Sequence, residues 1–248
     1  MTTPHLTPKE RIIFPLDFPS LKKATPFIRE LKDHVGLFKV GVTLILGEGL
    51  AVINRVTDLI GGQRIFIDVK FHDIPWQIGS ASHVIMSGSR GVKFITVHAS
   101  DGERIVRAVV EKVKNGTQVL GITVLTSVSK EESLEMDKAT VEQRVLALAH
   151  ISQNAGCAGV VCSGNEVKTV KATFGHNFIV VTPGIRPKWT HIPMDDQRRI
   201  TTSREALLNG ADYIVVGRPI SFAKDRVEAA HRIAQEIEEA VQQRQTHP

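Results

Sequence analysis

Short apolar runs, separated by amphipathic segments, recur along the whole chain. Eight of these runs are rich in Val, Ile and Phe, and several, such as FIVV and YIVV, are apolar at consecutive positions. Continuous apolar strands are typical of parallel sheets that helices cover. The pattern predicts strands near residues 11–17, 37–42, 64–71, 94–99, 118–125, 158–162, 178–183 and 213–217.

The spacing of these runs predicts the fold class. Eight strand-and-helix units in 248 residues give about 31 residues per unit. This unit length is typical of an α/β protein of the (β/α)8 TIM barrel type. No linker or change of composition divides the chain, so we expect a single domain over residues 1–248, with loose tails at about 1–10 and 242–248. Helix-start signals are expected at Thr140–Gln143, Ser163–Glu166, Asp101 and Ser203.

Composition narrows the class of protein. The chain is 42% apolar and 23% charged, its first eleven residues contain no apolar stretch, and no later apolar run is long enough to span a bilayer. We therefore expect a cytoplasmic protein with no membrane partner. The spacing of Cys157 and Cys162 matches no zinc or redox motif, which predicts reduced, packed thiols.

The basic charge also has a bearing on possible ligands. A net charge of +5 suits an anionic ligand or nucleic acid. Much of this charge is scattered over helix faces such as KKATPFIRELK, a pattern that favours solvated surface over a nucleic-acid stripe. We expect no nucleic-acid partner.

The stretch RIFIDVKFHDIP, residues 64–75, places unlike charges at the end of an apolar strand. Because strand side chains alternate, Asp68 and Lys70 are predicted to project from one face, with His72 and Asp73 directly after them. Charges this close cost desolvation energy unless they pair with one another or with a ligand. Two interpretations remain open at this point: an internal ion pair that closes one end of the barrel, or a ligand site.

Polar residues also stand at the ends of the other predicted strands. In a (β/α)8 barrel these ends form the active face. Each residue has a structural alternative, such as helix capping for Asp17 or a hydrogen-bonded core position for His98. Together they favour a site, and they are Asp17, Lys39, Asp68, Lys70, His98, Thr126, Ser127, Arg186, Gly217 and Arg218.

The connection after the seventh predicted strand is the second informative stretch. Residues 185–201, IRPKWTHIPMDDQRRIT, are longer than most strand-to-helix loops and contain two prolines, which suggests a functional lid. The stretch begins beside Arg186 and precedes Arg218, where (β/α)8 enzymes frequently bind phosphate. Guanidinium groups match phosphate oxygens, so we expect a phosphate ester as ligand. The alternative is a solvated basic loop.

With these residues identified, the chain resembles the bacterial orotidine 5′-phosphate decarboxylase family over nearly its whole length. The matching segments occur in the family's order. They are PLD at 15–17, LFKVG at 37–41, DVKFHDIP at 68–75, TVLTS at 123–127, PGIRP at 183–187, DQRRI at 196–200 and VVGRPI at 215–220. The resemblance implies decarboxylation of orotidine 5′-phosphate to UMP and CO2, in pyrimidine nucleotide synthesis.

The resemblance also implies catalytic roles. Lys70 is expected to protonate C6 of the pyrimidine, and Asp68 to face the substrate carboxylate. Lys39 is expected to link the charged array to the ribose. Asp73 is expected to enter the site from the neighbouring subunit of a homodimer.

The substrate-binding residues that the resemblance implies surround these four. Many bacterial members carry Asn-Thr after DIP where this chain has Trp76-Gln77, so Gln77 is expected to replace the threonine contact. The expected substrate-binding residues are Asp17, Lys39, Ile74, Gln77, Thr126, Ser127, Arg186, Gln197, Gly217 and Arg218.

Neither an electron-sink cofactor motif nor a metal motif is evident, so we expect a cofactor-independent enzyme. Two alternatives remain. A Mg²⁺-dependent sugar-phosphate decarboxylase or synthase of the same superfamily would lose activity with a chelator. A non-enzymatic nucleotide- or RNA-binding module would show salt-sensitive RNA binding, although 5% aromatic residues offer no evident base-stacking surface.

Overall fold

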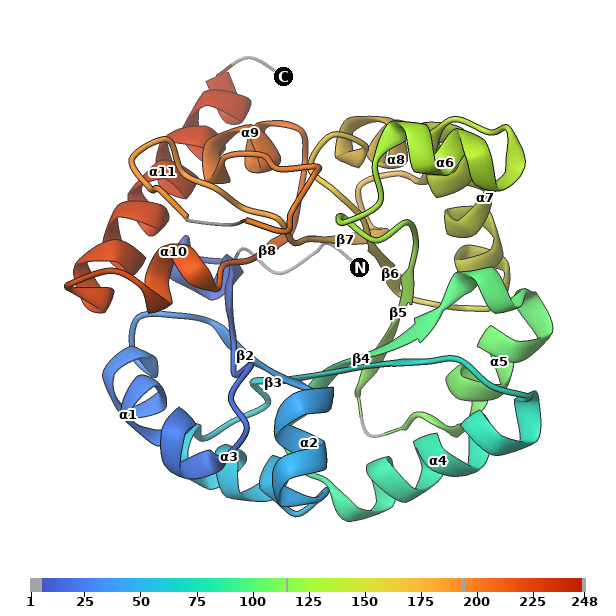
Figure 1. The fold of residues 1–248 in the computed structure, drawn as a ribbon, viewed down its shortest axis with the longest axis horizontal. Helices are drawn as coiled ribbons and strands as arrows, with labels where there is room; N and C mark the ends of the chain where they lie inside the picture. Colours follow the sequence, from blue (N-terminus) through green and yellow to red (C-terminus); the bar gives the residue numbers. More distant parts are fainter. Residues whose placement is uncertain (1–5, 115, 193–194, 247–248) are drawn as a thin grey trace.

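Eight parallel strands form a closed barrel in the computed structural model, which describes residues 6–114, 116–192 and 195–246. Each strand pairs with the next, and β8 pairs with β1, so the barrel has no free edge (Figure 1). Each of the eight strands overlaps one of the predicted runs, which confirms the (β/α)8 prediction. The strands are β1 (Ile12–Pro15), β2 (Leu37–Gly41), β3 (Ile65–Phe71), β4 (Val92–His98), β5 (Gln118–Ile122), β6 (Gly159–Val161), β7 (Ile179–Thr182) and β8 (Tyr213–Val215).

Helices surround this barrel on its outer side (Figure 1). Helix α1 illustrates the cause: its side chains at positions 21, 24, 28 and 31 are buried, which is the 3.6-residue spacing of one helix face. The helices are α1 (Leu21–Leu31), α2 (Val42–Glu48), α3 (Val52–Ile60), α4 (Pro75–Gly88), α5 (Glu103–Lys112), α6 (Lys130–Asp137), α7 (Val141–Asn154), α8 (Val167–Phe174), α9 (Ser203–Leu208), α10 (Arg218–Ser221) and α11 (Arg226–Thr246), with 3₁₀ turns η1 (Lys9–Arg11) and η2 (Ala99–Asp101).

The helix-start predictions had mixed outcomes. The capping box at Thr140 is present, with both of its reciprocal hydrogen bonds. The prediction at Ser203 was wrong by one residue, because Thr202 caps α9. The predictions at Ser163 and Asp101 were wrong for a different reason: their side chains bond to groups outside the following helix. Short polar residues near a helix start also have tertiary partners available.

The interior of the barrel is a packed core. Phe66 and Phe94 meet edge to face with ring centroids 5.9 Å apart, and the Phe94 and Tyr213 centroids lie 5.2 Å apart. Phe66 also lines the cavity above them. Phe66 therefore belongs both to this core and to the floor of the cavity at the carboxyl ends of the strands. The interior cluster is Ile13, Leu37, Phe66, Phe94, Leu120, Val181 and Tyr213.

The described parts of the predicted tails contain regular structure. Lys9–Arg11 forms η1, Leu6 packs against the interior cluster, and α11 continues to Thr246. The long C-terminal helix packs against α9, α10 and α1, and its positions 230, 233, 237 and 240 are buried. The looseness of the tails stays a prediction. The rest of the predicted tails, residues 1–5 and 247–248, lies outside the described residues.

Two further observations concern composition. Cys157 and Cys162 are buried and unpaired, as predicted, and burial raises the pKa of the Cys157 thiol to about 12. Among the described residues, no helix has the length and apolar character needed to cross a membrane.

Candidate active site

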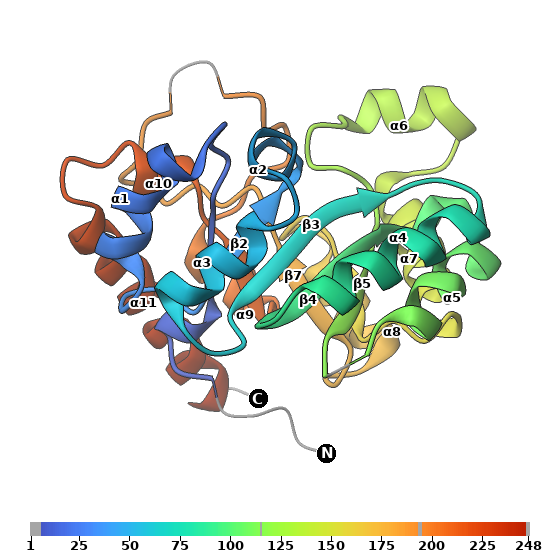
Figure 2. The same ribbon diagram turned by 90° about the horizontal axis from the view of Figure 1, so that it is seen from below.

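A cavity of about 310 Å³ opens at the carboxyl ends of the strands. Its volume lies at the lower end of the range for small-molecule sites. Figure 2 shows α6 and the described parts of the loop after β7 on this same side of the barrel. Ten of the predicted site residues line it: Asp17, Lys39, Asp68, Lys70, Thr126, Ser127, Arg186, Gln197, Gly217 and Arg218.

Four of these residues form a chain of alternating charge: Asp17 follows the end of β1, Lys39 is on β2, and Asp68 and Lys70 are on β3. Lys39 Nζ lies 2.9 Å from Asp17 Oδ1 and 3.3 Å from Asp68 Oδ2. Lys70 Nζ lies 2.7 Å from the same Asp68 oxygen. Because the strands bring Asp17, Lys39 and Asp68 together from distant parts of the sequence, the array is built by the barrel itself. We call these four residues the strand network.

Burial and charge pairing act in opposite directions within the strand network. Burial alone would raise the pKa of Asp68, but the charges of Lys39 and Lys70 hold that pKa below its ordinary value. Burial would likewise lower the pKa of Lys39, yet the carboxylates of Asp68 and Asp17 raise it. Both groups are therefore ionised at neutral pH, although their side chains are only 9% and 12% exposed.

An irregularity in β3 lets Lys70 reach Asp68. The register of β3 against β4 shifts between Ile67 and Phe71, and Lys70 has φ +50°, a left-handed conformation that is uncommon for a residue with a side chain. The buried Thr96 on β4 holds this conformation: its hydroxyl accepts from the Lys70 backbone N–H at 2.9 Å and donates to Asp68 Oδ1 at 3.1 Å. Strand alternation alone therefore does not explain the contact between Lys70 and Asp68. The sequence analysis did not identify Thr96 as a site residue.

Glycine provides space at two positions in the site. A Cβ on Gly41 would lie 3.3 Å from both Asp17 Oδ1 and Lys39 Nζ, so a side chain there would press on the ion pair. A Cβ on Gly217 would lie 2.9 Å from Cγ of Pro15. Gly217 is therefore needed for packing against β1 as well as for access to the cavity, and Gly41 was not singled out from the sequence.

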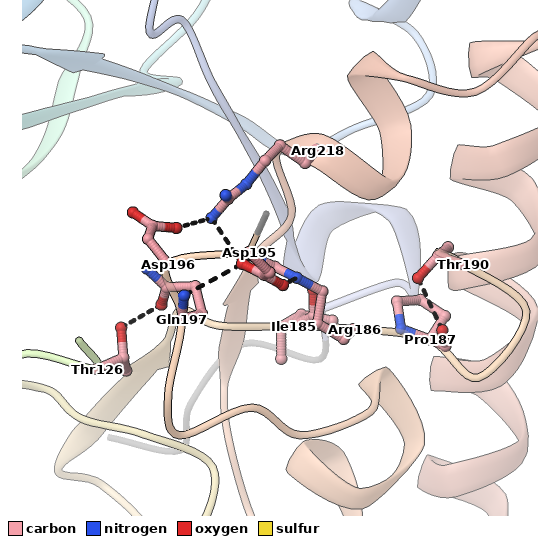
Figure 3. Close-up of polar contacts among 9 residues, drawn as sticks. All are labelled: Thr126, Ile185, Arg186, Pro187, Thr190, Asp195, Asp196, Gln197 and Arg218. Atoms are coloured by element: carbon pink, nitrogen blue, oxygen red, sulfur yellow. Dashed lines mark hydrogen bonds and ion pairs between the residues drawn. The ribbon is translucent and has the colours of Figure 1, made fainter. Parts of the chain in front are cut away.

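The loop after β7 and the start of α10 bring two arginines together at the other side of the cavity (Figure 3). Arg186 donates to Asp195 through two nitrogens, at 2.5 and 2.7 Å. Arg218 lies 2.5 Å from Asp196 and 3.2 Å from Asp195. We call Arg186, Asp195, Asp196 and Arg218 the loop cluster. The two aspartates are functional candidates that the motif reading did not single out.

A buried arginine ties this loop to the loop after β5. The Arg199 guanidinium donates to the carbonyls of Val124 and Leu125, and pairs with Glu166 at 2.9 Å. Its backbone N–H donates to the carbonyl of Thr126, whose hydroxyl in turn donates to the side chain of Gln197. Thr126 and Gln197 are thereby held together at the cavity wall.

Four predicted site residues do not line the cavity of their own chain. His98, at the end of β4, is half-buried with its ring centroid 5.9 Å from that of His72. Asp73, Ile74 and Gln77 are exposed around the start of α4, and Asp73 accepts a hydrogen bond from the Ile74 backbone N–H at 2.7 Å. Ile74 and Trp76 are 62% and 79% exposed. No group of three or more His, Cys, Asp or Glu side chains among the described residues could hold a metal ion.

The fold and the site define a class. A closed (β/α)8 barrel with fixed ion pairs and a pair of arginines at the carboxyl ends of its strands is a barrel enzyme that acts on a small anionic substrate. The profile described as the orotidine 5′-phosphate decarboxylase / HUMPS family matches residues 10–233.

Individual relatives give the same result. The chain is 40% identical over 239 residues to an orotidine 5′-phosphate decarboxylase of Desulfosudis oleivorans, covering 94% of this chain and 95% of that protein. It is 41% identical to one of Heliobacterium modesticaldum, covering 95% and 99%. The crystal structure of orotidine 5′-phosphate decarboxylase from Lactobacillus acidophilus matches with a TM-score of 0.76, 30% identity, and coverage of 91% and 98%. The chain belongs to the orotidine 5′-phosphate decarboxylase / HUMPS family.

Proposed function

We propose that the chain decarboxylates orotidine 5′-phosphate to UMP and CO2, a step of pyrimidine nucleotide synthesis. The observation that carries this proposal is the strand network, a row of fixed alternating charges that shares one cavity with two arginines. The family membership and the curated relatives named orotidine 5′-phosphate decarboxylase support it.

The strand network suits the chemistry of this reaction. Loss of CO2 breaks the bond to C6 and leaves the electron pair in the ring plane, where it cannot delocalise into the π system. The Lys70 ammonium can stabilise that charge and then donate its proton to C6, while Asp68 disfavours the substrate carboxylate beside it. The Asp68 and Lys70 side chains already meet at 2.7 Å, so the charges need little reorganisation.

Binding energy from the phosphate completes the account. The largest enzymatic accelerations, about 10¹⁷, correspond to roughly 23 kcal/mol of selective stabilisation, more than two lysines can supply. Contacts at the phosphate, remote from C6, can provide energy that orders the loop and excludes water from the ring. We assign this role to Arg186, Arg218, Gln197 and Gly217, with Thr126 and Ser127 beside the nucleotide.

A spectrophotometric assay with orotidine 5′-phosphate in EDTA tests the proposal. We expect turnover to UMP at a rate that EDTA leaves unchanged. The matched control is the same assay with the Lys70→Ala variant, which removes the proposed proton donor. Full inactivation by EDTA, restored by Mg²⁺, would instead support a metal-dependent sugar-phosphate decarboxylase or synthase.

We also propose a homodimer in which each Asp73 serves the partner's site. Asp73 is exposed beside Ile74 and Trp76, two large apolar side chains that a monomer would leave in water. On helix α2, which directly follows β2, Val42 and Leu46 lie one helical turn apart and are 45% and 81% exposed. A second copy that covers these surfaces would bury them and could bring Asp73, Ile74 and Gln77 to the other cavity.

Hybrid dimers test this arrangement. Inactive Lys70→Ala and Asp73→Ala chains are unfolded together and refolded as an equal mixture, with each variant refolded alone as the control. Each hybrid has one doubly defective site and one site with intact Lys70 and the partner's intact Asp73. About half the dimers are hybrids, so activity should return to roughly a quarter of wild type. An inactive mixture in which hybrids are shown to have formed would mean that Asp73 serves its own chain.

We further propose a cytoplasmic location for this enzyme. Its proposed substrate and product are nucleotides whose charged phosphates cross membranes poorly, and both cysteines are buried and unpaired, as expected for a reducing compartment. Fractionation of the source cells, followed with an antibody to the chain, tests this; enrichment with the membrane or an extracellular fraction would contradict it.

A further inference from the structure

The two carboxylates of the loop cluster engage the arginines in different ways, as Figure 3 shows. Asp195 uses both of its oxygens: Oδ2 accepts from Arg186 Nε, and Oδ1 accepts from Arg186, from the Gln197 backbone N–H at 3.1 Å, and lies 3.2 Å from Arg218. The Asp196 carboxylate pairs with Arg218 through one oxygen, Oδ1. Asp195 therefore contacts both arginines and the backbone at Gln197, whereas Asp196 contacts Arg218 alone.

Exposure separates the two aspartates in the same way. The Asp195 side chain is 21% exposed and its partner Arg186 is 11% exposed. The Asp196 side chain is 70% exposed. An exposed single ion pair contributes little free energy, whereas a bidentate, partly buried pair is stronger and fixes geometry. The Asp196 contact is therefore the easier of the two to break.

The charges of the loop cluster cancel. Hydrogen bonds from Arg186 to Asp195, and from Arg218 to Asp196, lower the pKa of each carboxyl group, so both are anions at neutral pH. With two guanidinium groups opposite them, the cluster has no net charge. A phosphate dianion that approaches this cluster competes with a carboxylate for the same N–H donors of Arg218.

We propose that Asp196 is an internal counter-ion that the substrate phosphate displaces from Arg218, and that Asp195 is a positioning residue that keeps both guanidinium groups oriented during the exchange. This inference rests on the proposed function for the identity of the phosphate ester. Displacement of Asp196 leaves the cluster with a net positive charge, which complements the phosphate. The adjacent Gln197 also lines the cavity and follows Asp195 and Asp196 in the chain, so the exchange occurs where the phosphate is expected to bind.

Calorimetric titration with UMP, and NMR titration with uridine at millimolar concentration, separate the two roles. Asp196→Asn removes the competing charge and should tighten UMP binding about two- to fivefold, the size of an exposed ion pair, with uridine binding unchanged. Asp195→Asn should weaken UMP binding about tenfold or more, because it releases Arg186 and Arg218, and should also leave uridine binding unchanged. Asp58→Asn is the matched control, since Asp58 is 57% exposed and pairs with Arg90 at 2.7 Å away from the cavity.

The UMP and uridine affinities of the two variants can contradict the proposal in distinct ways. Weaker UMP binding in Asp196→Asn, or an equal effect of both substitutions, would overturn the division of roles. Equal shifts for UMP and uridine would overturn it too, because they would show a structural effect on the whole cavity. UMP binding as predicted, without turnover of orotidine 5′-phosphate, would contradict the proposed function and leave this inference standing. If Asp195→Asn does not fold, Asp195→Glu provides the test. This substitution keeps the negative charge but moves the carboxylate by one methylene group, so it should weaken UMP binding and leave uridine binding unchanged.

Discussion

The strand network and the loop cluster each pair cations with carboxylates, yet they differ in where the chain places them. The strand network lies on β2, β3 and the residues just after β1, and its Lys39 and Asp68 side chains are 12% and 9% exposed. The loop cluster stands on the loop after β7 and the start of α10, and its Arg218 and Asp196 side chains are 30% and 70% exposed. The first set of charges is held by the barrel, whereas in the second set the exposed pair of Arg218 and Asp196 can exchange partners.

This difference matches two requirements of the proposed reaction. Charges that act on a developing carbanion must be in place before reaction, and a rigid sheet provides that placement. Charges that capture a phosphate must release their own partners first, and an exposed loop permits that release at small cost. Substitutions in the strand network, in the loop cluster and in the outer part of the loop after β7 test this division, and we expect effects that decrease in the order given.

Lys70→Ala should lower kcat by at least about a thousandfold, because it removes the proposed proton donor and the cation beside C6. UMP affinity should change little, since the loop cluster is untouched. Steady-state kinetics and UMP titration measure both quantities, with the exposed Lys22→Ala as control. A Lys70→Ala enzyme with a tenth of wild-type kcat would exclude this role.

Arg218→Ala should lower kcat/KM for orotidine 5′-phosphate by about a hundredfold or more, because a charged contact to the phosphate is lost. The measurement is made well below KM, and the control is Arg90→Ala, an arginine whose exposed ion pair lies away from the cavity. A loss no larger than that of the control would mean that Arg218 does not hold phosphate.

Asp68→Asn should reduce the free energy of unfolding at neutral pH by about 1–3 kcal/mol, because Lys39 and Lys70 lose a shared partner. The folded-state pKa of Asp68 is lowered, so its stabilisation is present above the unfolded pKa, about 3.9, and is lost as pH falls through the folded pKa. Urea unfolding at pH 7 and at about pH 2 should therefore show a wild-type advantage that shrinks in acid. An advantage that grows in acid would contradict this sign.

Trp189→Phe should have the smallest effect. The Trp189 indole N–H donates to Glu236 Oε1 at 2.8 Å, and the Arg232 guanidinium carbon lies 4.3 Å from its ring centroid, so the outer part of the loop is fastened to α11. Loss of one hydrogen bond should cost about 0.5–1.5 kcal/mol of stability and less than about threefold in kcat/KM. Thermal unfolding and steady-state kinetics check this; a large loss of kcat would place Trp189 in the chemistry.

The sequence was most informative where the barrel determines the geometry. Strand ends of a (β/α)8 barrel converge, so Asp17, Lys39 and Asp68 could be assigned to one site from strand periodicity alone. The left-handed Lys70 and its support by Thr96 could not be predicted, because they depend on a register shift between β3 and β4.

Side-chain contacts within the long loop after β7 could not be predicted from hydrophobic periodicity either. The segment DQRRI matched the family, yet the pairing of Asp195 and Asp196 with the two arginines depends on how the loop folds back. The same holds for Arg199, which the sequence did not single out and which is buried against the loop after β5. Local patterns do not encode such long-range side-chain contacts.

The most direct test of the division between the two regions is the ratio of kcat/KM for orotidine 5′-phosphate to kcat/KM for orotidine, which lacks the phosphate. In Arg218→Ala this ratio should fall about a hundredfold, because orotidine turnover stays within about twofold of wild type. In Lys70→Ala both values should collapse together. An equal loss of both substrates in Arg218→Ala would contradict the account, because it would show that the loop cluster acts on the reacting ring and not on the phosphate.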